Sequence, residues 1–292
     1  MRALPWLLAA VLPLAAQPSA LELLEAKTVE RIRDLDRGFE GVLGVAAIDL
    51  ETGRLFGYHA DSVFPQASVI KIPILIAVYR AQQEGRFRLA DPVTLHPKDA
   101  VGGSGHLQTA LKQGPVTLTL RQMVNDMIEA SDNTATNQWI ATLGMDYVNR
   151  TAAALGASST RLQRKMMDSA AAQRNDENIS TPSEMARLVE AIYRGKAVDR
   201  AACDEMIAFM KKVHGGIAEG LPLDIVTASK IGEIPGARGE TGIVYLEGRP
   251  FVLSVMSTFI DDRRSPVPEV TRIVFHYFEK VAASNRYGNR LR

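Results

Sequence analysis

The chain has 292 residues, of which 46% are hydrophobic, and a formal net charge of +1 at pH 7. It is too apolar to be disordered, and it is long enough for one large core or two subdomains. A neutral charge balance without basic clusters argues against nucleic acid as a partner. The histidines are scattered and none forms a pair at zinc-ligand spacing, so neither a metal site nor a His-dependent triad is expected. They are His59, His96, His106, His214 and His276.

The first twenty residues, MRALPWLLAAVLPLAAQPSA, have the layout of a secretory signal peptide. Arg2 supplies the positive charge, an apolar stretch follows, and residues 16–20 are mostly small, as a cleavage site requires. The weaker alternative is an N-terminal anchor, because the apolar stretch is shorter than the ~20 residues that span a bilayer. Cys203, the only cysteine, lies far from this region and leaves no internal disulfide and no lipid-attachment cysteine. We therefore expect a monomeric periplasmic or secreted protein, without stable membrane insertion after removal of the signal peptide (residues 1–20).

The rest of the chain predicts strands at both ends and helices between them. Residues 21–38 carry apolar side chains at helical spacing on a charged background and predict an amphipathic helix. VLGVAAIDL and LFGYHA, separated by the turn-like ETGR, predict a β-hairpin. From Ser68 to about residue 222, the chain is expected to be mainly helical with long loops.

Strand patterns return in GLPLDIVTASKIG, TGIVYLEG and RPFVLSVMSTFI, and PEVTRIVFHYFEKVAAS predicts a final helix. This order predicts an α/β (α+β) fold with one antiparallel sheet built from both ends of the chain. We expect residues 21–63 and 223–292 to form this α/β subdomain. Residues 64–222 would form an inserted, mainly helical subdomain.

A lysine, Lys71, interrupts the apolar run FPQASVIKIPILIAVY three residues after Ser68. Pro73 is tolerated only near a helix start, so the helix should begin close to Ser68, with Lys71 on the same face and in contact with it. An ammonium group buried among apolar side chains has a lowered pKa, and such a lysine can take the proton of a serine hydroxyl. The alternative is a snorkelling lysine whose stem covers apolar surface.

Two further stretches carry candidate polar groups. Ser131-Asp132-Asn133 suits a tight interhelical loop, or else Ser131 passes a proton to a leaving group while Asn133 holds a substrate amide. Lys230 ends a predicted strand, and Gly232 after it lets a ligand approach the backbone. Lys230 is therefore either a solvated edge residue or an anchor for a carboxylate that also lowers the pKa of the second serine.

Ser68-x-x-Lys71, Ser131-Asp132-Asn133 and Lys230-x-Gly232 occur in the order known for penicillin-recognising serine enzymes. With these motifs the chain resembles the class A β-lactamases over nearly its whole mature length. The resemblance implies a five-stranded antiparallel sheet flanked by helices, packed on an all-helical subdomain, with the site in the cleft between them. It also implies that no cofactor is needed and that the partner is a small-molecule β-lactam or a peptide-like cell-wall substrate.

The resemblance implies a reaction as well. Ser68 would attack the β-lactam carbonyl to give an acyl-enzyme, which water then releases. Lys71 would act as base or proton relay, and Ser131 would protonate the departing ring nitrogen. Backbone amides of Ser68 and Glu233 would form an oxyanion hole.

The resemblance also implies substrate-binding residues. Lys230, at the Lys230-x-Gly232 motif and with Arg238 nearby, would face the substrate carboxylate. Asn133 would hold the side-chain amide. One departure from the family pattern lies here, because Ile231 replaces a threonine or serine hydroxyl that hydrogen-bonds the substrate carboxylate.

A second departure concerns the release of product. In the family, an Arg-x-Glu pattern supplies the glutamate that activates the deacylating water, with an asparagine further along. Here Arg164 is present, but Met166 replaces the glutamate and Ala170 the asparagine. Asn178 replaces the aspartate that pairs with the arginine, so the loop is expected to lose its usual clasp. Asp168 is the nearest acid that would substitute, although an exposed loop acid is its more ordinary interpretation.

Two minor expectations concern the surroundings of the site. VGGSGHLQ, residues 101–108, is expected to be a loop that lines the cleft. Met166 and Met167 are expected to be gap-filling core residues.

Three hypotheses follow. The first is an active β-lactamase whose water is activated by Asp168, by Lys71 or by another group. The second is a penicillin-binding, peptidase-like or esterase-like serine hydrolase that β-lactams acylate and that releases them slowly. The third is a pseudoenzyme that uses the cleft as a binding module. The intact Ser68, Lys71, Ser131 and Lys230 argue against the third.

Overall fold

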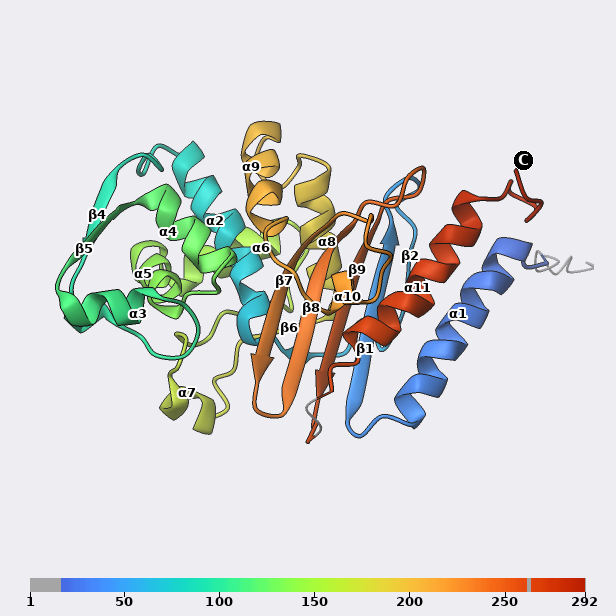
Figure 1. Cartoon of the computed structure of the whole chain (residues 1–292), viewed down its shortest axis with the longest axis horizontal. Coiled ribbons are helices and arrows are strands. Elements are labelled where there is room, and N and C mark those ends of the chain that lie inside the picture. Colours follow the sequence, from blue (N-terminus) through green and yellow to red (C-terminus); the bar gives the residue numbers. More distant parts are fainter. Residues whose placement is uncertain (1–16, 262–263, 292) are drawn as a thin grey trace, which may run out of the picture.

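The computed structural model describes residues 17–261 and 264–291 and contains a five-stranded antiparallel sheet in the order β2-β1-β9-β8-β7. Its strands are β1 (Val42–Asp49), β2 (Leu55–Tyr58), β7 (Thr227–Ile234), β8 (Ala237–Val244) and β9 (Phe251–Thr258). Because β1 pairs with β9 along its whole length, the two ends of the chain meet at the centre of the sheet. Figure 1 shows this sheet between a helical region and a pair of outer helices.

The predicted α/β (α+β) class and five-stranded antiparallel sheet are confirmed, as are the first hairpin and both terminal helices. One strand was misplaced, because β8 begins at Ala237 and TGIVYLEG begins at Thr241. The polar residues Glu240 and Thr241 point into buried surroundings, which hides this strand from a hydrophobicity pattern. The predicted subdomain boundaries stay a prediction. Most of the expected signal segment, residues 1–16, lies outside the described residues.

The outer face of the sheet is covered by α1 (Ala20–Arg37) and α11 (Val267–Ala282), which pack on each other. Phe251 of β9 stacks on Phe278 of α11, with ring centroids 4.2 Å apart. Both belong to a buried apolar cluster that fixes the two helices on the sheet. This burial explains why the amphipathic patterns at the chain ends predicted these helices correctly.

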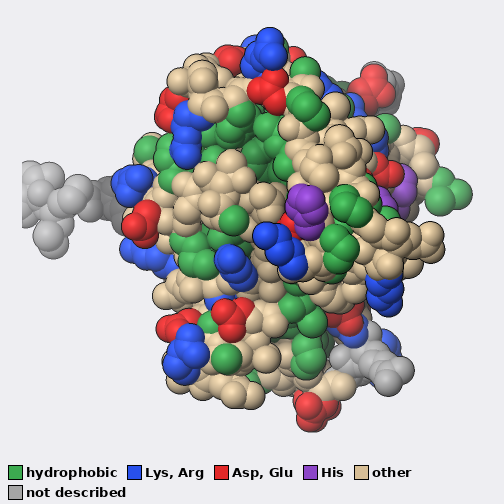
Figure 2. Space-filling model, turned by 90° about the vertical axis from the view of Figure 1, so that its left-hand side faces the viewer, with side chains coloured by type: hydrophobic (Ala, Val, Ile, Leu, Met, Phe, Trp, Pro, Cys, Tyr) green, Lys and Arg blue, Asp and Glu red, His purple; other side chains and the backbone are tan. Residues whose placement is uncertain are grey.

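The other face of the sheet packs on α8 (Pro182–Tyr193), behind which lies the helical region. This region contains η1 (Ala67–Ile70), α2 (Lys71–Gln83), α4 (Leu120–Ile128), α5 (Asn133–Leu143), α6 (Met145–Ala154) and α9 (Arg200–Met210). Shorter helices are η2 (Pro97–Asp99), α3 (Leu107–Ala110), η3 (Leu111–Gln113), α7 (Ser169–Gln173) and α10 (Gly216–Glu219). Figure 2 shows that acidic, basic and hydrophobic side chains are interspersed on one face of this region.

Two short two-stranded antiparallel sheets interrupt the region that was expected to be mainly helical. β3 (Phe64–Pro65) pairs with β6 (Ile179–Ser180), and β4 (Pro92–Leu95) pairs with β5 (Val116–Thr119). The helix of the opening apolar run is α2, and almost its entire length is buried. No helix in the described part of the chain is long and apolar enough to cross a membrane.

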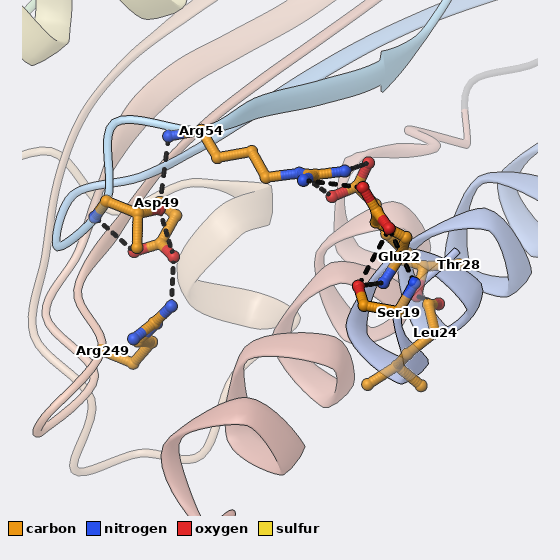
Figure 3. Close-up of polar contacts among 9 residues, drawn as sticks. Ser19, Glu22, Leu24, Thr28, Asp49, Arg54 and Arg249 are labelled. Atoms are coloured by element: carbon orange, nitrogen blue, oxygen red, sulfur yellow. Dashed lines mark hydrogen bonds and ion pairs between the residues drawn. The ribbon is translucent and has the colours of Figure 1, made fainter. Parts of the chain in front are cut away.

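Polar contacts fix the start of α1 and join it to the edge of the sheet (Figure 3). Ser19 caps the helix and exchanges hydrogen bonds with Glu22 in a capping box. Arg54 of the β1–β2 turn donates from Nε to Glu25 Oε2 at 2.7 Å. At the end of β1, Asp49 accepts a hydrogen bond from Arg249 of the β8–β9 turn. These contacts hold the start of α1 and the β8–β9 turn against the sheet, at the end where β1 leads into the β1–β2 turn.

Candidate active site

A cleft of about 860 Å³ lies where η1, the 101–108 loop and the 161–180 loop meet the β7–β8 turn. Its lining includes Ser68, Asn133, Met166, Asp168 and Glu233. Gly103 and Ser104 also line it, which confirms the predicted place of VGGSGHLQ. The cleft therefore brings residues from five separate parts of the chain to one space.

Ser68 lies in η1, directly before α2, and the backbone of β7 passes close to it. A Cβ atom built on Gly232 would lie 2.9 Å from the backbone nitrogen of Ser68 and 2.7 Å from the carbonyl oxygen of Gln66. Only glycine allows this approach, because real Cβ atoms essentially never come within 3.0 Å of other heavy atoms. The Ser68 amide thus faces the strand that carries Glu233.

Lys71 is fully buried, and its Nζ lies within hydrogen-bond distance of three oxygens of the 131–133 loop. Its Nζ lies 2.6 Å from Ser131 O, 3.0 Å from Ser131 Oγ and 3.0 Å from Asn133 Oδ1. Burial, and then the charge of Lys230, holds its pKa well below the usual lysine range, partly opposed by Asp132. Within the described residues no hydrogen bond joins Lys71 to Ser68, and Lys71 instead bonds the 131–133 loop; the contact between Lys71 and Ser68 stays a prediction.

Ser131 stands between the two lysines of the site. Its Oγ accepts from Lys71 Nζ at 3.0 Å and from Lys230 Nζ at 3.1 Å. Its backbone has φ 52°, a left-handed conformation that few residues other than glycine adopt. Two donors on one hydroxyl oxygen leave its own proton free to point elsewhere.

Lys230 lies on β7 with 2% of its surface exposed. Besides Ser131 Oγ, its Nζ donates to the carbonyl oxygen of Ile231 at 2.8 Å. Burial lowers the pKa of Lys230 to about 8, and the charge of Glu240 opposes that shift. It is therefore no solvated edge residue, and neither lysine forms an ion pair in the described part of the chain.

The Ser131-Asp132-Asn133 loop is tied to the 101–108 loop. Asp132 caps α5 by accepting from Ala135 N at 3.0 Å, and its other oxygen accepts from Leu107 N at 2.9 Å. Asn133 donates from Nδ2 to Gly102 O at 2.9 Å. Asp132 thus has a structural role in this loop. That role is compatible with functional roles for Ser131 and Asn133, which the loop carries.

The sequence matches the profile described as "Beta-lactamase enzyme family" over residues 27–278. The chain belongs to the β-lactamase enzyme family. It is 28% identical over 280 residues to β-lactamase CTX-M-97 of Escherichia coli, an alignment that covers 92% of this chain and 95% of the relative.

Several solved structures share the fold. A β-lactamase from Sphaerobacter thermophilus superimposes with a TM-score of 0.76 and 28% identity, covering 88% of this chain and 96% of the other. PBP-A superimposes with a TM-score of 0.79 and 27% identity, covering 87% and 96%. A PBP-A mutant described as an acyl-enzyme complex with penicillin G has a TM-score of 0.78 at 27% identity, with 90% and 100% coverage.

In this family member, the Arg164 side chain pairs with Glu177 and not with residue 178, so the usual pair of the 161–180 loop is lost, as predicted, and a different pair replaces it. Arg164 pairs with Glu177 through two hydrogen bonds, Nε to Oε1 at 3.0 Å and Nη2 to Oε2 at 2.9 Å. Asn178 adds hydrogen bonds from the backbone amides of Gln163 and Arg164 to its Oδ1. Sequence reasoning missed Glu177 because it compared only position 178, although an acid one residue earlier was the available signal.

Met166 and Met167 differ from each other in their surroundings. Met166 is 7% exposed and lies at the cleft wall, as a gap-filling residue would. Met167 is 60% exposed, with φ 63°, so its prediction as a core residue was wrong. Asp168 is exposed and caps α7 by accepting from Ala171 N at 2.9 Å. Its carboxylate thus already has a structural partner.

Glu233 and Arg238 face each other across the β7–β8 turn. Their Cα atoms are paired in the ladder, and Arg238 Nη2 lies 2.9 Å from Glu233 Oε1. Arg238 is therefore engaged with a carboxylate of its own chain at the cleft mouth.

The described residues include no group of three or more His, Cys, Asp or Glu side chains arranged to hold a metal ion.

Proposed function

We propose that this chain is a serine β-lactamase that opens β-lactam rings through an acyl-enzyme on Ser68, with slow release of the product. The observation that carries the proposal is Ser131 Oγ, which two buried lysines hold at 3.0 and 3.1 Å beside the cleft that contains Ser68. Such an arrangement serves proton transfer, because lysines without a carboxylate partner lose their protons easily.

In the proposed acylation step, Ser68 Oγ attacks the lactam carbonyl carbon. Its proton passes to neutral Lys71, directly or through Ser131 Oγ. The backbone amides of Ser68 and Glu233 stabilise the oxyanion. Collapse of this intermediate breaks the C–N bond, and Ser131 gives its proton to the ring nitrogen while Lys71 replaces it. The products of the step are an ester on Ser68 and a secondary amine.

In the same proposal, Lys230 attracts the substrate carboxylate, with Arg238 near it at the turn. Gly232 leaves room for the substrate along β7, and Asn133 holds the side-chain amide. Asn133 Oδ1 and Nδ2 both have partners within the protein, to Lys71 and Gly102. This fixes the orientation of the amide before substrate arrives.

Deacylation is the slow step of the proposal because a methionine cannot remove a proton from water. Met166 occupies the cleft wall, and Asp168 is exposed and engaged as a helix cap. The second candidate is a penicillin-binding, peptidase-like or esterase-like hydrolase that β-lactams acylate and that turns them over poorly. The likeness to PBP-A and the absence of an acid at Met166 favour it.

Intact-mass spectrometry after mixing with benzylpenicillin tests the proposal and separates the candidates. An adduct of one intact penicillin on Ser68 that decays with release of penicilloate supports the slow β-lactamase. An adduct that persists without product supports the second candidate. No adduct and no hydrolysis across penicillins, cephalosporins and carbapenems would contradict both and favour the binding module. Ser68→Ala must abolish adduct and turnover alike.

The proposal extends to location and partners. We propose a monomeric periplasmic or secreted enzyme whose partner is a small-molecule β-lactam or a peptide-like cell-wall substrate, with no cofactor. The signal-like residues 1–20 and the interspersed charges of Figure 2 support it. N-terminal sequencing of the exported protein tests the cleavage, and light scattering tests the monomer.

A further inference from the structure

Part of the cleft lining has no role in the proposed mechanism. It consists of apolar side chains from η1, the 161–180 loop and the β7–β8 turn, namely Ala67, Met166, Met167, Ala172, Ile234 and Pro235. Binding sites for small molecules are mostly apolar, with a few polar groups that fix the orientation of the ligand. An apolar surface in the same cleft as Ser68 is therefore available to a substrate group that takes no part in the chemistry.

Met167 combines two features that are unfavourable in a folded chain. Its surface is 60% exposed although the side chain is apolar, and its backbone has φ 63°. A left-handed backbone is costly for a residue with a side chain and persists only where the surrounding structure holds it. Here a hydrogen bond from Ser169 N to Met167 O at 3.0 Å and the Asp168 cap of α7 hold the turn. The loop thus keeps a large apolar side chain at the surface of the cleft.

Met167 and Asn133 both lie close to Gly103 of the 101–108 loop. A Cβ atom built on Gly103 would lie 3.0 Å from Met167 Sδ and 2.7 Å from Asn133 Nδ2. Met167 therefore reaches across to this loop next to the side-chain amide of Asn133, where the substrate amide is held in the proposed function. The group that a substrate carries beyond this amide then lies against the thioether. A thioether is polarisable and packs favourably on aromatic rings.

The charged side chains that line the cleft already have partners within the protein. Arg164 is paired with Glu177, and Glu233 with Arg238. Asp168 is engaged as the cap of α7. A charged substituent on the substrate therefore gains no new ion pair from these groups, and burying it unpaired against an apolar surface is costly.

We propose that Met167 is a specificity-determining residue that selects β-lactams with an aromatic or another large apolar acyl side chain. This inference rests on the proposed function, because it needs Ser68 to be acylated and Asn133 to hold the side-chain amide. Met167 contributes apolar contact in the bound complex and takes no part in the proton transfers. Its effect therefore lies in the binding step and not in the chemical step.

The test compares two penicillins that share the nucleus and the side-chain amide. Benzylpenicillin carries a benzyl group beyond the amide, whereas 6-acetamidopenicillanic acid carries a methyl group. Stopped-flow acylation at several concentrations gives the dissociation constant of the noncovalent complex and the acylation rate constant for each. We expect the ratio of these two constants to favour benzylpenicillin at least about tenfold in the wild type, since even one methylene in an apolar pocket is worth about that much.

Met167→Gln replaces the thioether with an amide of similar size, and the exposed position should tolerate the change. The preference for benzylpenicillin should fall at least about threefold through weaker binding, with the acylation rate constant at saturation unchanged. Met167→Leu, which keeps an apolar side chain, should retain most of the preference. Leu223→Gln is the matched control, because Leu223 is fully exposed and lies outside the cleft lining, and it should show the wild-type preference.

Equal acylation by the two penicillins in the wild type would overturn the inference. A Met167→Gln protein that keeps the wild-type preference would also overturn it, whether the two rates stay the same or fall together. Both outcomes leave the proposed function standing, because Ser68 is still acylated. Absence of any acylation in the wild type would instead remove the proposed function and this inference with it.

Discussion

Asn137 holds the backbone of Met166 with both ends of its side-chain amide. Its Oδ1 accepts from Met166 N at 2.8 Å, and its Nδ2 donates to Met166 O at 3.1 Å. With the Arg164–Glu177 pair, this contact fixes the loop that forms one wall of the cleft. The scaffold that would present a water-activating acid is therefore intact, and the side chain on it is apolar.

Met166→Glu should accelerate deacylation. A carboxylate at this position supplies a general base beside the acyl-enzyme, and such bases typically contribute ~10²- to 10⁴-fold. We expect the benzylpenicillin adduct to decay at least about tenfold faster, measured by intact-mass spectrometry after removal of free penicillin. Met166→Gln, with the same size and no charge, is the control. Equal decay in both variants would mean that release depends on another group.

Lys71→Met should abolish acylation in a protein that still folds. Methionine matches the length of the lysine stem and removes an amine that is costly to bury, but it leaves Ser131 O and Asn133 Oδ1 without this donor, at a cost of about 1–3 kcal/mol for each unsatisfied group. We expect the acylation rate constant to fall at least about 100-fold, because the general base is lost. Thermal unfolding should stay cooperative, which separates the loss of acylation from a loss of the fold. Acylation near the wild-type rate would mean that another residue acts as the base.

Acylation should decline on the alkaline side as Lys230 loses its proton. Its pKa of about 8 lies below the ordinary lysine value because of burial, so the group is charged at pH 7 and mostly neutral at pH 9. Stopped-flow acylation by benzylpenicillin from pH 6 to pH 10 should therefore show a limb near pH 8. A flat profile up to pH 10 would mean that Lys230 keeps its proton or that its charge is not needed.

Protein stability should increase over the pH range in which acylation declines, because both depend on the proton of Lys230. The folded state releases the Lys230 proton at about pH 8, whereas the unfolded chain keeps it until near the ordinary lysine pKa. Between these values the unfolded state binds more protons, so the contribution of Lys230 to the free energy of unfolding rises with pH. Urea unfolding of the wild type and Lys230→Met should show an advantage of the variant at pH 7 that shrinks by pH 10.

The organisation of the fold could be predicted because its signals are local. Apolar periodicity located α1, α11, β1, β2 and β9, and the fully apolar run around Lys71 predicted the buried α2. The start of β8 could not be predicted in this way, since its buried polar residues find partners only in three dimensions. The pairing of β4 with β5 was missed for a related reason, because each strand has four residues, of which one is buried, and helical turns separate the two in the sequence.

The site was predicted as a set of residues and less well as a set of contacts. The motifs named Ser68, Lys71, Ser131 and Lys230, and spacing along a helix predicted that Lys71 contacts Ser68, but spacing could not predict its hydrogen bonds to the 131–133 loop. The lysine reaches across to this loop, whose approach depends on the packing of α2 against α5. Glu177 was missed because its pairing with Arg164 follows from loop geometry.

Glu177→Gln should destabilise the protein, because it leaves the Arg164 guanidinium buried without its carboxylate. Removing one partner of such a pair typically costs ~3–5 kcal/mol when fully buried, and we expect about half of that for a Glu177 side chain that is 23% exposed. Chemical unfolding measures the loss. Asp204→Asn, which breaks the exposed Arg200–Asp204 pair on α9, is the control and should change stability by less than about 1 kcal/mol.

Gly232→Ala should separate the nucleophile from β7. The added methyl group would lie 2.7 Å from Gln66 O, 2.8 Å from Val69 N and 2.9 Å from Ser68 N, and backbone atoms cannot yield as a flexible side chain does. We expect a stability loss of about 1–3 kcal/mol from overpacking and a fall in acylation rate of at least about tenfold. Gly38→Ala is the control, since its Cβ would meet only Leu35 O at 3.8 Å. If Gly232→Ala is acylated at the wild-type rate, close approach of β7 to Ser68 is not needed, and an oxyanion site formed by the Ser68 and Glu233 amides loses its support.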